Sequence, residues 1–152
     1  MKRFSVFGVP IDSLTEDELL ARLLRDRGLV TTPNPEILLA ARSNAAYRDL
    51  LRSSALAIPD GIAVRFAVAA LDGSIGLARH TGVDVVPLLP SGAIANDESL
   101  VLLGGFTEDL AKIRDRFIAQ HFALRCVTID PGVIDASLPI LDKAIIDQIA
   151  AL

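Results

Sequence analysis

Two segments in the first half of the chain constrain its fold most, because each joins a short strand-like stretch to a helix-like stretch. The first is Thr31-Thr32-Pro33-Asn34-Pro35-Glu36, and the second is Ile58-Pro59-Asp60-Gly61. If the two strands pair in parallel, both segments lie at the same edge of the sheet, where open α/β sheets bind ligands. The sequence therefore predicts a crevice where a hydroxyl, an amide and a carboxylate converge.

Strand-like and helix-like stretches alternate along the whole chain. Apolar or β-prone stretches predict a strand or hairpin at 4–11 and strands at 29–32, 56–58, 99–103 and 124–129. Helices are expected over 15–28, 36–52, 62–71, 83–89, 107–121 and 138–152, with a turn at 90–92. This pattern predicts one α/β domain over residues 1–152, with a Rossmann-like, mostly parallel sheet flanked by helices and a small N-terminal hairpin.

Some elements carry more specific expectations. The helix at 62–71 is apolar apart from Arg65, which predicts burial on most of its sides. The stretch 99–103 is the clearest buried strand, and Thr107 is suited to cap the helix that follows it. Cys126 is the only cysteine, so no disulfide framework is expected, and we interpret it as a buried, inert thiol.

Composition excludes several classes of protein. The chain has 152 residues, 51% of them hydrophobic and 22% charged, which is typical of a globular domain. Its net charge of −4 argues against a broad nucleic-acid-binding surface. The N-terminal segment lacks the apolar region of a signal peptide, and no stretch is long enough to span a membrane. We therefore expect a cytoplasmic protein, with contact to the inner face of the plasma membrane left open.

Asp60, Thr32 and Asn34 each have a structural and a chemical interpretation. Asp60 in Pro-Asp-Gly is an ordinary turn residue, or a half-desolvated carboxylate that acts as a general base on a sugar hydroxyl. Thr32 and Asn34 mark a proline-stiffened strand exit, or orient a sugar or diphosphate beside the amino end of the next helix. The local sequence leaves both interpretations open.

Arg79 and the pair Gly104-Gly105 are also candidates. Arg79 is a surface residue, or it neutralises a leaving diphosphate with its planar donors. Gly104-Gly105 follows a strand and precedes a helix, so it forms a simple turn or a phosphate loop, although it matches neither GxGxxG nor the Walker pattern. No cluster of His, Cys, Asp and Glu has metal-ligand spacing, and no serine or cysteine triad is evident.

Five motifs, in order, resemble one family. They are Gly8-Val9-Pro10-Ile11-Asp12, Thr32-Pro33-Asn34-Pro35-Glu36, Pro59-Asp60-Gly61, Arg79-His80-Thr81-Gly82-Val83-Asp84 and Leu102-Leu103-Gly104-Gly105. Together they are similar to the WecG/TagA/CpsF glycosyltransferases over roughly residues 4–152. The resemblance implies inverting transfer of an N-acetylmannosamine-type or related sugar from a UDP-sugar to a polyprenyl-diphosphate-linked acceptor at the membrane. The pathway would be wall teichoic acid, enterobacterial common antigen or exopolysaccharide synthesis.

The same resemblance assigns roles to residues. Asp60 resembles the family's proposed catalytic base, and Thr32 its active-site threonine. The resemblance implies substrate-binding roles for Asn34, Arg79, Asp84, Gly104 and Gly105. It also implies that no cofactor and no bound metal are needed.

Relative to the family pattern, the chain is expected to lack a C-terminal part that contributes to the donor site. An alternative function is therefore a non-catalytic module that binds a nucleotide sugar or serves as an assembly partner. An unrelated Rossmann-like oxidoreductase is disfavoured because no GxGxxG follows the first strand. The missing strand would leave a sheet edge or a helix face exposed, which predicts a homo-oligomer.

Overall fold

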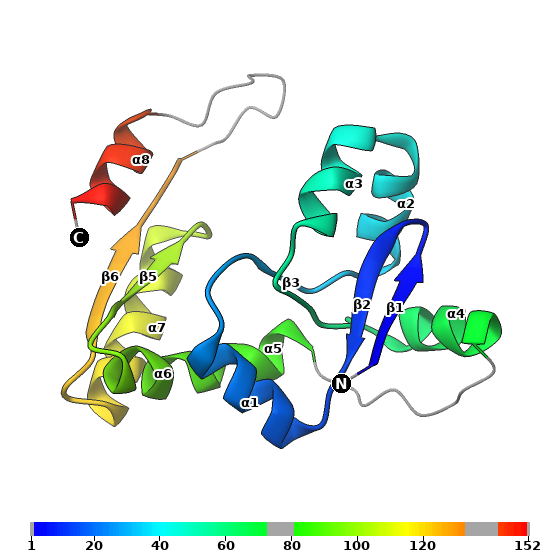
Figure 1. Ribbon diagram of the computed structural model, residues 1–152. Coiled ribbons are helices and arrows are strands. Elements are labelled where there is room, and N and C mark those ends of the chain that lie inside the picture. The colour runs from blue at the N-terminus through cyan, green and yellow to red at the C-terminus, as the bar shows by residue number, and fades with distance from the viewer. Residues whose placement is uncertain (1, 73–80, 133–142, 152) are drawn as a thin grey trace. The chain divides into compact units, whose positions relative to one another are not determined.

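The computed structural model describes residues 2–72, 81–132 and 143–151 (Figure 1). The chain divides into two compact units, residues 1–88 and 89–152, and each unit is described by itself. The expectation of a single domain stays a prediction.

The first unit begins with the expected hairpin. β1 (Lys2–Val6) and β2 (Val9–Ser13) pair antiparallel, with Phe7 and Gly8 as the two residues of the turn (Figure 1). The turn therefore precedes Pro10, which sits inside β2 opposite Ser5. α1 (Glu16–Arg25) follows, and Thr15 caps it through a reciprocal pair of hydrogen bonds with Glu18.

The strands that precede the two polar segments pair in parallel, as predicted. β3 (Val30–Thr31) and β4 (Leu56–Ala57) are neighbours, with Thr31 opposite Ala57. β3 leads to α2 (Pro35–Ser43), and β4 leads to α4 (Ile62–Asp72). Both strand–loop–helix connections thus leave the same edge of this small sheet.

The single helix expected over 36–52 is wrong. The chain forms α2 and a second helix, α3 (Ala45–Arg52), which are separated by Asn44 in an extended conformation. The Asn44 side chain accepts a hydrogen bond from the N–H of Tyr47 at 3.0 Å. Asparagine competes for the backbone in this way, so it ends one helix and caps the next.

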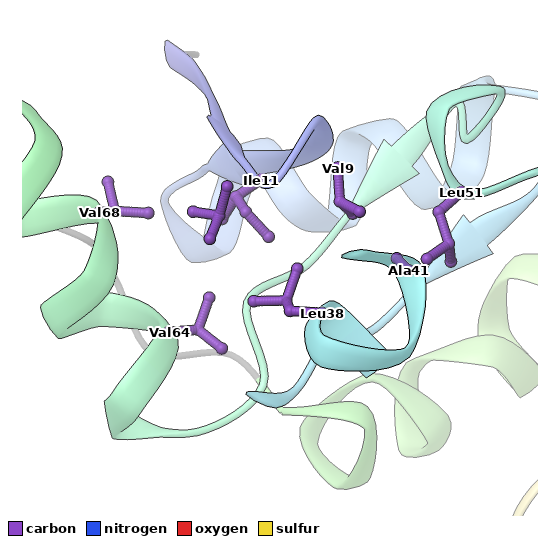
Figure 2. Packing of buried hydrophobic residues seen from close by; sticks show 8 residues of the cluster. Val9, Ile11, Leu38, Ala41, Leu51, Val64 and Val68 are labelled. Carbon is purple, nitrogen blue, oxygen red and sulfur yellow. The ribbon is translucent and has the colours of Figure 1, made fainter. Parts of the chain in front are cut away.

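The core of the first unit lies between the hairpin and three helices. Figure 2 shows the apolar side chains of β2, α2, α3 and α4 gathered there. The fully buried members of this cluster are Val6, Val9, Ile11, Leu38, Ala41, Leu51, Val64 and Val68. Packing of these side chains fixes the hairpin, α2 and α4 against one another.

The expected burial of α4 on most sides is wrong. Val64 and Val68 are buried, but Ile62, Phe66 and Leu71 on the other faces are exposed. The helix packs on the hairpin along one stripe only, because the described residues of the first unit supply no second layer over it. α5 (Gly82–Val85) and a short 3₁₀ helix, η1 (Val86–Leu88), complete this unit.

The second unit repeats the strand–helix–strand pattern. α6 (Leu89–Ala95) precedes β5 (Ser99–Leu103), α7 (Thr107–Gln120) and β6 (Arg125–Ile129), and β5 pairs in parallel with β6 in full register. Ala93, Phe117 and Leu124 form its buried core. α8 (Lys143–Ala150) covers most of the described part of the helix expected over 138–152, and residues 138–142 lie outside the described residues.

Three expectations for the second unit are wrong. The turn at 90–92 lies within α6, because a proline in the first turn of a helix gives up no backbone hydrogen bond. β5 is only partly buried, since the described residues cover it incompletely. Phe106, not Thr107, occupies the cap position of α7, and the Thr107 hydroxyl bonds Asp130 instead.

The fold is mixed α/β, as predicted. Among the described residues there are three two-stranded sheets, of which two are parallel and the N-terminal hairpin is antiparallel. Within the described ranges, none of the helices has the length and apolar character required to cross a bilayer.

Candidate functional site

The edge of the β3–β4 sheet brings two predicted site residues together. Two backbone hydrogen bonds continue the pairing past the ends of the strands. The N–H of Ile58 donates to the carbonyl of Thr31 at 2.8 Å, and the N–H of Asp60 donates to the carbonyl of Pro33 at 2.9 Å. These bonds hold the backbone of Thr32 and Pro33 beside that of Pro59 and Asp60. The predicted convergence of the two polar segments is therefore present in the backbone.

Asp60 is half-buried at this edge. Among the described residues, no hydrogen-bond donor contacts its carboxylate. The next residue, Gly61, has φ +90, a left-handed conformation that favours glycine. A Cβ built on Gly61 would meet nothing within 4 Å, which means that backbone conformation, not lack of space, selects glycine here.

Asn34 has a structural task in addition to its predicted one. Its side-chain oxygen accepts a hydrogen bond from the N–H of Ile37 at 2.9 Å and so caps α2, whose first residue is Pro35. The cap uses the oxygen of the amide and not its nitrogen. The Asn34 NH₂ group is therefore still chemically suited to donate to a sugar or phosphate oxygen.

The start of α5 lies against Thr32. A Cβ built on Gly82 would approach the Thr32 methyl carbon to 3.6 Å and its hydroxyl oxygen to 3.7 Å. Both the N–H and the hydroxyl of Thr81 donate to the Asp84 carboxylate at 2.8 Å. Asp84 thus shapes the loop that approaches Thr32. Arg79 and His80, which precede this loop, lie outside the described residues.

Gly104 and Gly105 form a second sheet edge, in the other unit. They follow β5 with φ values of +95 and +82, and the N–H of Gly104 donates to the carbonyl of Ile129 at 3.2 Å. Open space surrounds the position of a Cβ on either residue, so the left-handed backbone is what requires glycine. The structure does not place this loop relative to Thr32 and Asp60.

Sequence reasoning missed Asp130, which lies beside the glycine loop. Its carboxylate accepts hydrogen bonds from the Thr107 hydroxyl and, at 2.8 Å, from the N–H of Gly132. The hydroxyl first, and then the N–H group, lower the pKa of Asp130 from its ordinary value. The signal was Asp-Pro-Gly after a strand, which is similar to the Pro-Asp-Gly that follows β4.

Asp12 is the other residue whose role the motif did not reveal. Its carboxylate is fully buried and forms a two-pronged ion pair with Arg3, at 2.6 and 2.7 Å. It also accepts the N–H of Ala57 in β4 at 2.8 Å. The Asp12 hydrogen bonds raise the pKa of Arg3. Arg3 and Asp12 face each other across the hairpin, a pairing that a two-residue turn at Phe7-Gly8 predicts.

Within the described ranges, no three side chains of His, Cys, Asp or Glu converge as metal ligands do. Cys126 is half-buried and not fully buried as expected, and burial raises the pKa of its thiol. The thiolate that nucleophilic chemistry needs is accordingly disfavoured.

The comparisons with known proteins come to one positive finding. The profile of the glycosyl transferase WecG/TagA/CpsF family matches residues 4–152, nearly the whole chain. No curated protein matches the chain at a significant level.

Proposed function

The chain belongs to the WecG/TagA/CpsF family of glycosyltransferases, which act in cell-surface polysaccharide synthesis, and on that premise we propose its reaction. It transfers an N-acetylmannosamine-type or related hexose from a UDP-sugar to a polyprenyl-diphosphate-linked acceptor, with inversion at the anomeric carbon. It works at the cytoplasmic face of the membrane, needs no metal or cofactor, and self-associates.

Asp60 is the proposed general base. Its carboxylate removes the proton from the acceptor hydroxyl as that oxygen attacks the anomeric carbon of the donor. The new carbon–oxygen bond forms on the face opposite UDP, while the bond to the UDP oxygen breaks. Asp60 holds the proton, and UDP leaves with the electron pair of the broken bond.

The other predicted residues orient the reactants or balance charge. Thr32 contributes a hydroxyl beside Asp60, and Asn34 contributes an NH₂ donor. Arg79 and backbone N–H groups stabilise the charge that develops on UDP. Asp84 shapes the loop against Thr32. The Gly104 N–H bonds the Ile129 carbonyl and fixes the second loop, so that the Gly105 N–H is the proposed donor to a phosphate oxygen.

One observation carries this proposal for the site. The parallel pairing of β3 and β4 continues through the bond from the Asp60 N–H to the Pro33 carbonyl, at 2.9 Å. It brings a threonine and a carboxylate without a bonded donor among the described residues to one sheet edge. This is the edge at which parallel α/β sheets bind their ligands.

The test is Asp60→Asn, which removes the base but keeps a similar shape. General-base assistance accounts for about 10²–10⁴-fold in rate, so we expect turnover to fall by that factor. Stability should be nearly unchanged, because the described residues give the carboxylate no partner to lose. Transfer is measured with a UDP-sugar and a short-chain polyprenyl-diphosphate acceptor.

Asp49→Asn is the matched control, since Asp49 is an exposed carboxylate on α3 of the same unit, with a surface partner in Arg52. Near-normal turnover of Asp60→Asn, or an equal loss in Asp49→Asn, would remove Asp60 from the role of base. Binding of UDP by calorimetry without any transfer by the unaltered chain would instead support the nucleotide-sugar-binding module.

A further inference from the structure

An apolar groove of about 560 Å³ lies in the first unit between β1, α2 and α4. This volume is within the range of ligand pockets, about 300–1,000 Å³. Ser5 is its one polar lining residue among those that the structure describes. The lining residues are Ser5, Val6, Phe7, Pro35, Leu38, Leu39, Ala63, Val64, Ala67, Ala70 and Leu71.

Large apolar side chains around this groove are exposed, and we call them the apolar face. Soluble proteins rarely expose several large apolar side chains together unless the surface meets a partner or a membrane. The members and their exposed fractions are Phe7 50%, Leu39 56%, Ile62 63%, Phe66 66% and Leu71 70%.

Helical spacing makes the part of this face on α4 continuous. Ile62 and Phe66 are four residues apart, as are Phe66 and Ala70, so each pair lies on neighbouring turns. Ala70 and Leu71 line the groove. The apolar surface of α4 therefore extends from the groove around to Ile62 without a charged residue in between.

Phe7 stands at the tip of the hairpin in a conformation that costs energy. Its φ is +52, and that of Gly8 is +81. Two-residue hairpin turns with positive φ at both positions strongly favour Asn-Gly or Asp-Gly, and a bulky residue there is strained. Strain of this kind points to a function of the side chain, here an exposed aromatic ring that projects from a turn.

Two arginines lie beside the Phe7-Gly8 turn. The guanidinium carbon of Arg42 lies 5.5 Å from the centre of the Phe7 ring, and the Arg48 side chain packs against Gly8. Among the described residues, neither arginine has a carboxylate partner. Glu36, the acidic residue of α2, is in the first turn, whereas Arg42 is in the last. This end of the face is therefore cationic, although the chain carries a net charge of −4.

We infer that the apolar face docks on a bilayer that contains anionic lipids, with Phe7 inserted as an anchor. An aromatic ring and apolar side chains next to arginines match the apolar and anionic layers of such a surface. The inference deepens the proposed function and rests on it for the membrane-bound acceptor. α2 and α4, which line the groove, begin at the loops of Thr32 and Asp60, so docking would bring that site to the lipid surface.

The first test is Phe7→Asn, measured by co-sedimentation with phosphatidylcholine vesicles that contain phosphatidylglycerol. We expect binding to fall about tenfold or more, because a large apolar side chain no longer leaves water. Thermal stability should be unchanged or higher, because Asn-Gly is the preferred turn sequence. A loss of binding together with a gain in stability cannot come from unfolding.

Arg42→Gln tests the charge. A basic residue near an anionic surface contributes about fivefold in binding, so we expect that loss on vesicles with phosphatidylglycerol and no change on neutral vesicles. Phe122→Ser is the control, since Phe122 is 95% exposed but belongs to the other unit. This variant should bind as the unaltered chain does.

Each of the following outcomes would overturn the inference. One is that Phe7→Asn binds vesicles as the unaltered chain does, and another is that Phe122→Ser loses as much binding as Phe7→Asn. Loss of self-association by Phe7→Asn in sedimentation, while no variant binds vesicles, would assign the face to a second copy of the chain. Transfer to a soluble acceptor is measured in parallel. If the unaltered chain transfers sugar to the soluble acceptor but binds no vesicles, the docking inference fails and the proposed function stands.

Discussion

At the scale of single residues, the ion pair of Arg3 and Asp12 connects the hairpin to the strand that leads to Asp60. Asp12 is buried and bonds the N–H of Ala57, while Arg3 donates to the carbonyl of Ala55 at 3.1 Å. Both side chains thus bond the backbone of β4 or of the residue just before it. Burial of an ion pair stabilises a fold only when its remaining hydrogen-bonding groups are satisfied, as they are here by the backbone of Ala55 and Ala57.

Arg3→Met should lower the free energy of unfolding by about 2–3 kcal/mol, since it leaves a buried carboxylate without its charged donor. This loss in free energy of unfolding is smaller than the loss expected for a fully buried ion pair, because 39% of the Arg3 side chain is exposed. Arg25→Met is the control, because Arg25 is 71% exposed beside Asp26, and surface pairs contribute about 1 kcal/mol or less. Urea unfolding measures both, and equal losses would contradict this account.

The roles of these residues could be predicted only in part from sequence. Thr32 and Asp60 were placed at one sheet edge because parallel strands align their carboxyl ends, a rule that needs no side-chain detail. Asp12 was visible in a motif, but its burial depends on the hairpin turn falling at Phe7-Gly8 and on β4 lying next to β2. That contact joins residues 45 apart in sequence, and local patterns carry no information about it.

At the scale of elements, α2 starts where the candidate site does. Asn34 provides its cap, Pro35 its first residue and Glu36 an acidic side chain in its first turn. All three features stabilise the amino end of a helix. The same asparagine was predicted from sequence to bind substrate, so its two tasks need separate measurements.

Asn34→Ala should lower the free energy of unfolding by about 1 kcal/mol through loss of the cap. Asn34→Asp keeps an oxygen for the Ile37 N–H and should restore that stability, but it lacks the NH₂ donor and adds a negative charge. If Asn34 also binds the donor, Asn34→Asp will raise the KM for UDP-sugar at normal stability. An unchanged KM for UDP-sugar in Asn34→Asp would show that Asn34 acts only as the helix cap. Thermal melts and steady-state kinetics supply both readouts.

Helices and strands were predicted well where neighbouring residues in the sequence determine them, and poorly where contacts with distant residues do. The boundaries of β5 and β6 follow from short apolar stretches bounded by glycine and aspartate. The division of 36–52 at Asn44 was missed, because its apolar residues continue at helical spacing on both sides of the cap. The exposure of α4 was missed because an apolar helix indicates burial only if other elements cover it.

At the scale of the whole molecule, the two parallel strand pairs carry similar polar segments at their carboxyl ends. One pair presents Thr32 and Asp60, and the other presents Gly104, Gly105 and Asp130. Fold class and the residues at each edge follow from strand–helix alternation and turn chemistry. The relation between the two edges does not, because no local pattern encodes how two units pack.

The charge balance of the whole reaction leads to a last prediction, on divalent metal ions. The leaving UDP carries negative charge that a transferase neutralises with a metal ion or with its own donors. In the proposed reaction, Arg79 and backbone N–H groups neutralise this charge. We therefore expect turnover in excess EDTA to stay within about twofold of turnover in magnesium. Such a loss is much smaller than the loss of about 10²–10³-fold that follows removal of one oxyanion donor. Arg79→Met should lower turnover by about 10²-fold in either buffer, with Arg116→Met as a control in the other unit. Loss of activity in EDTA that magnesium restores would show that a bound cation, and not Arg79, neutralises the leaving group.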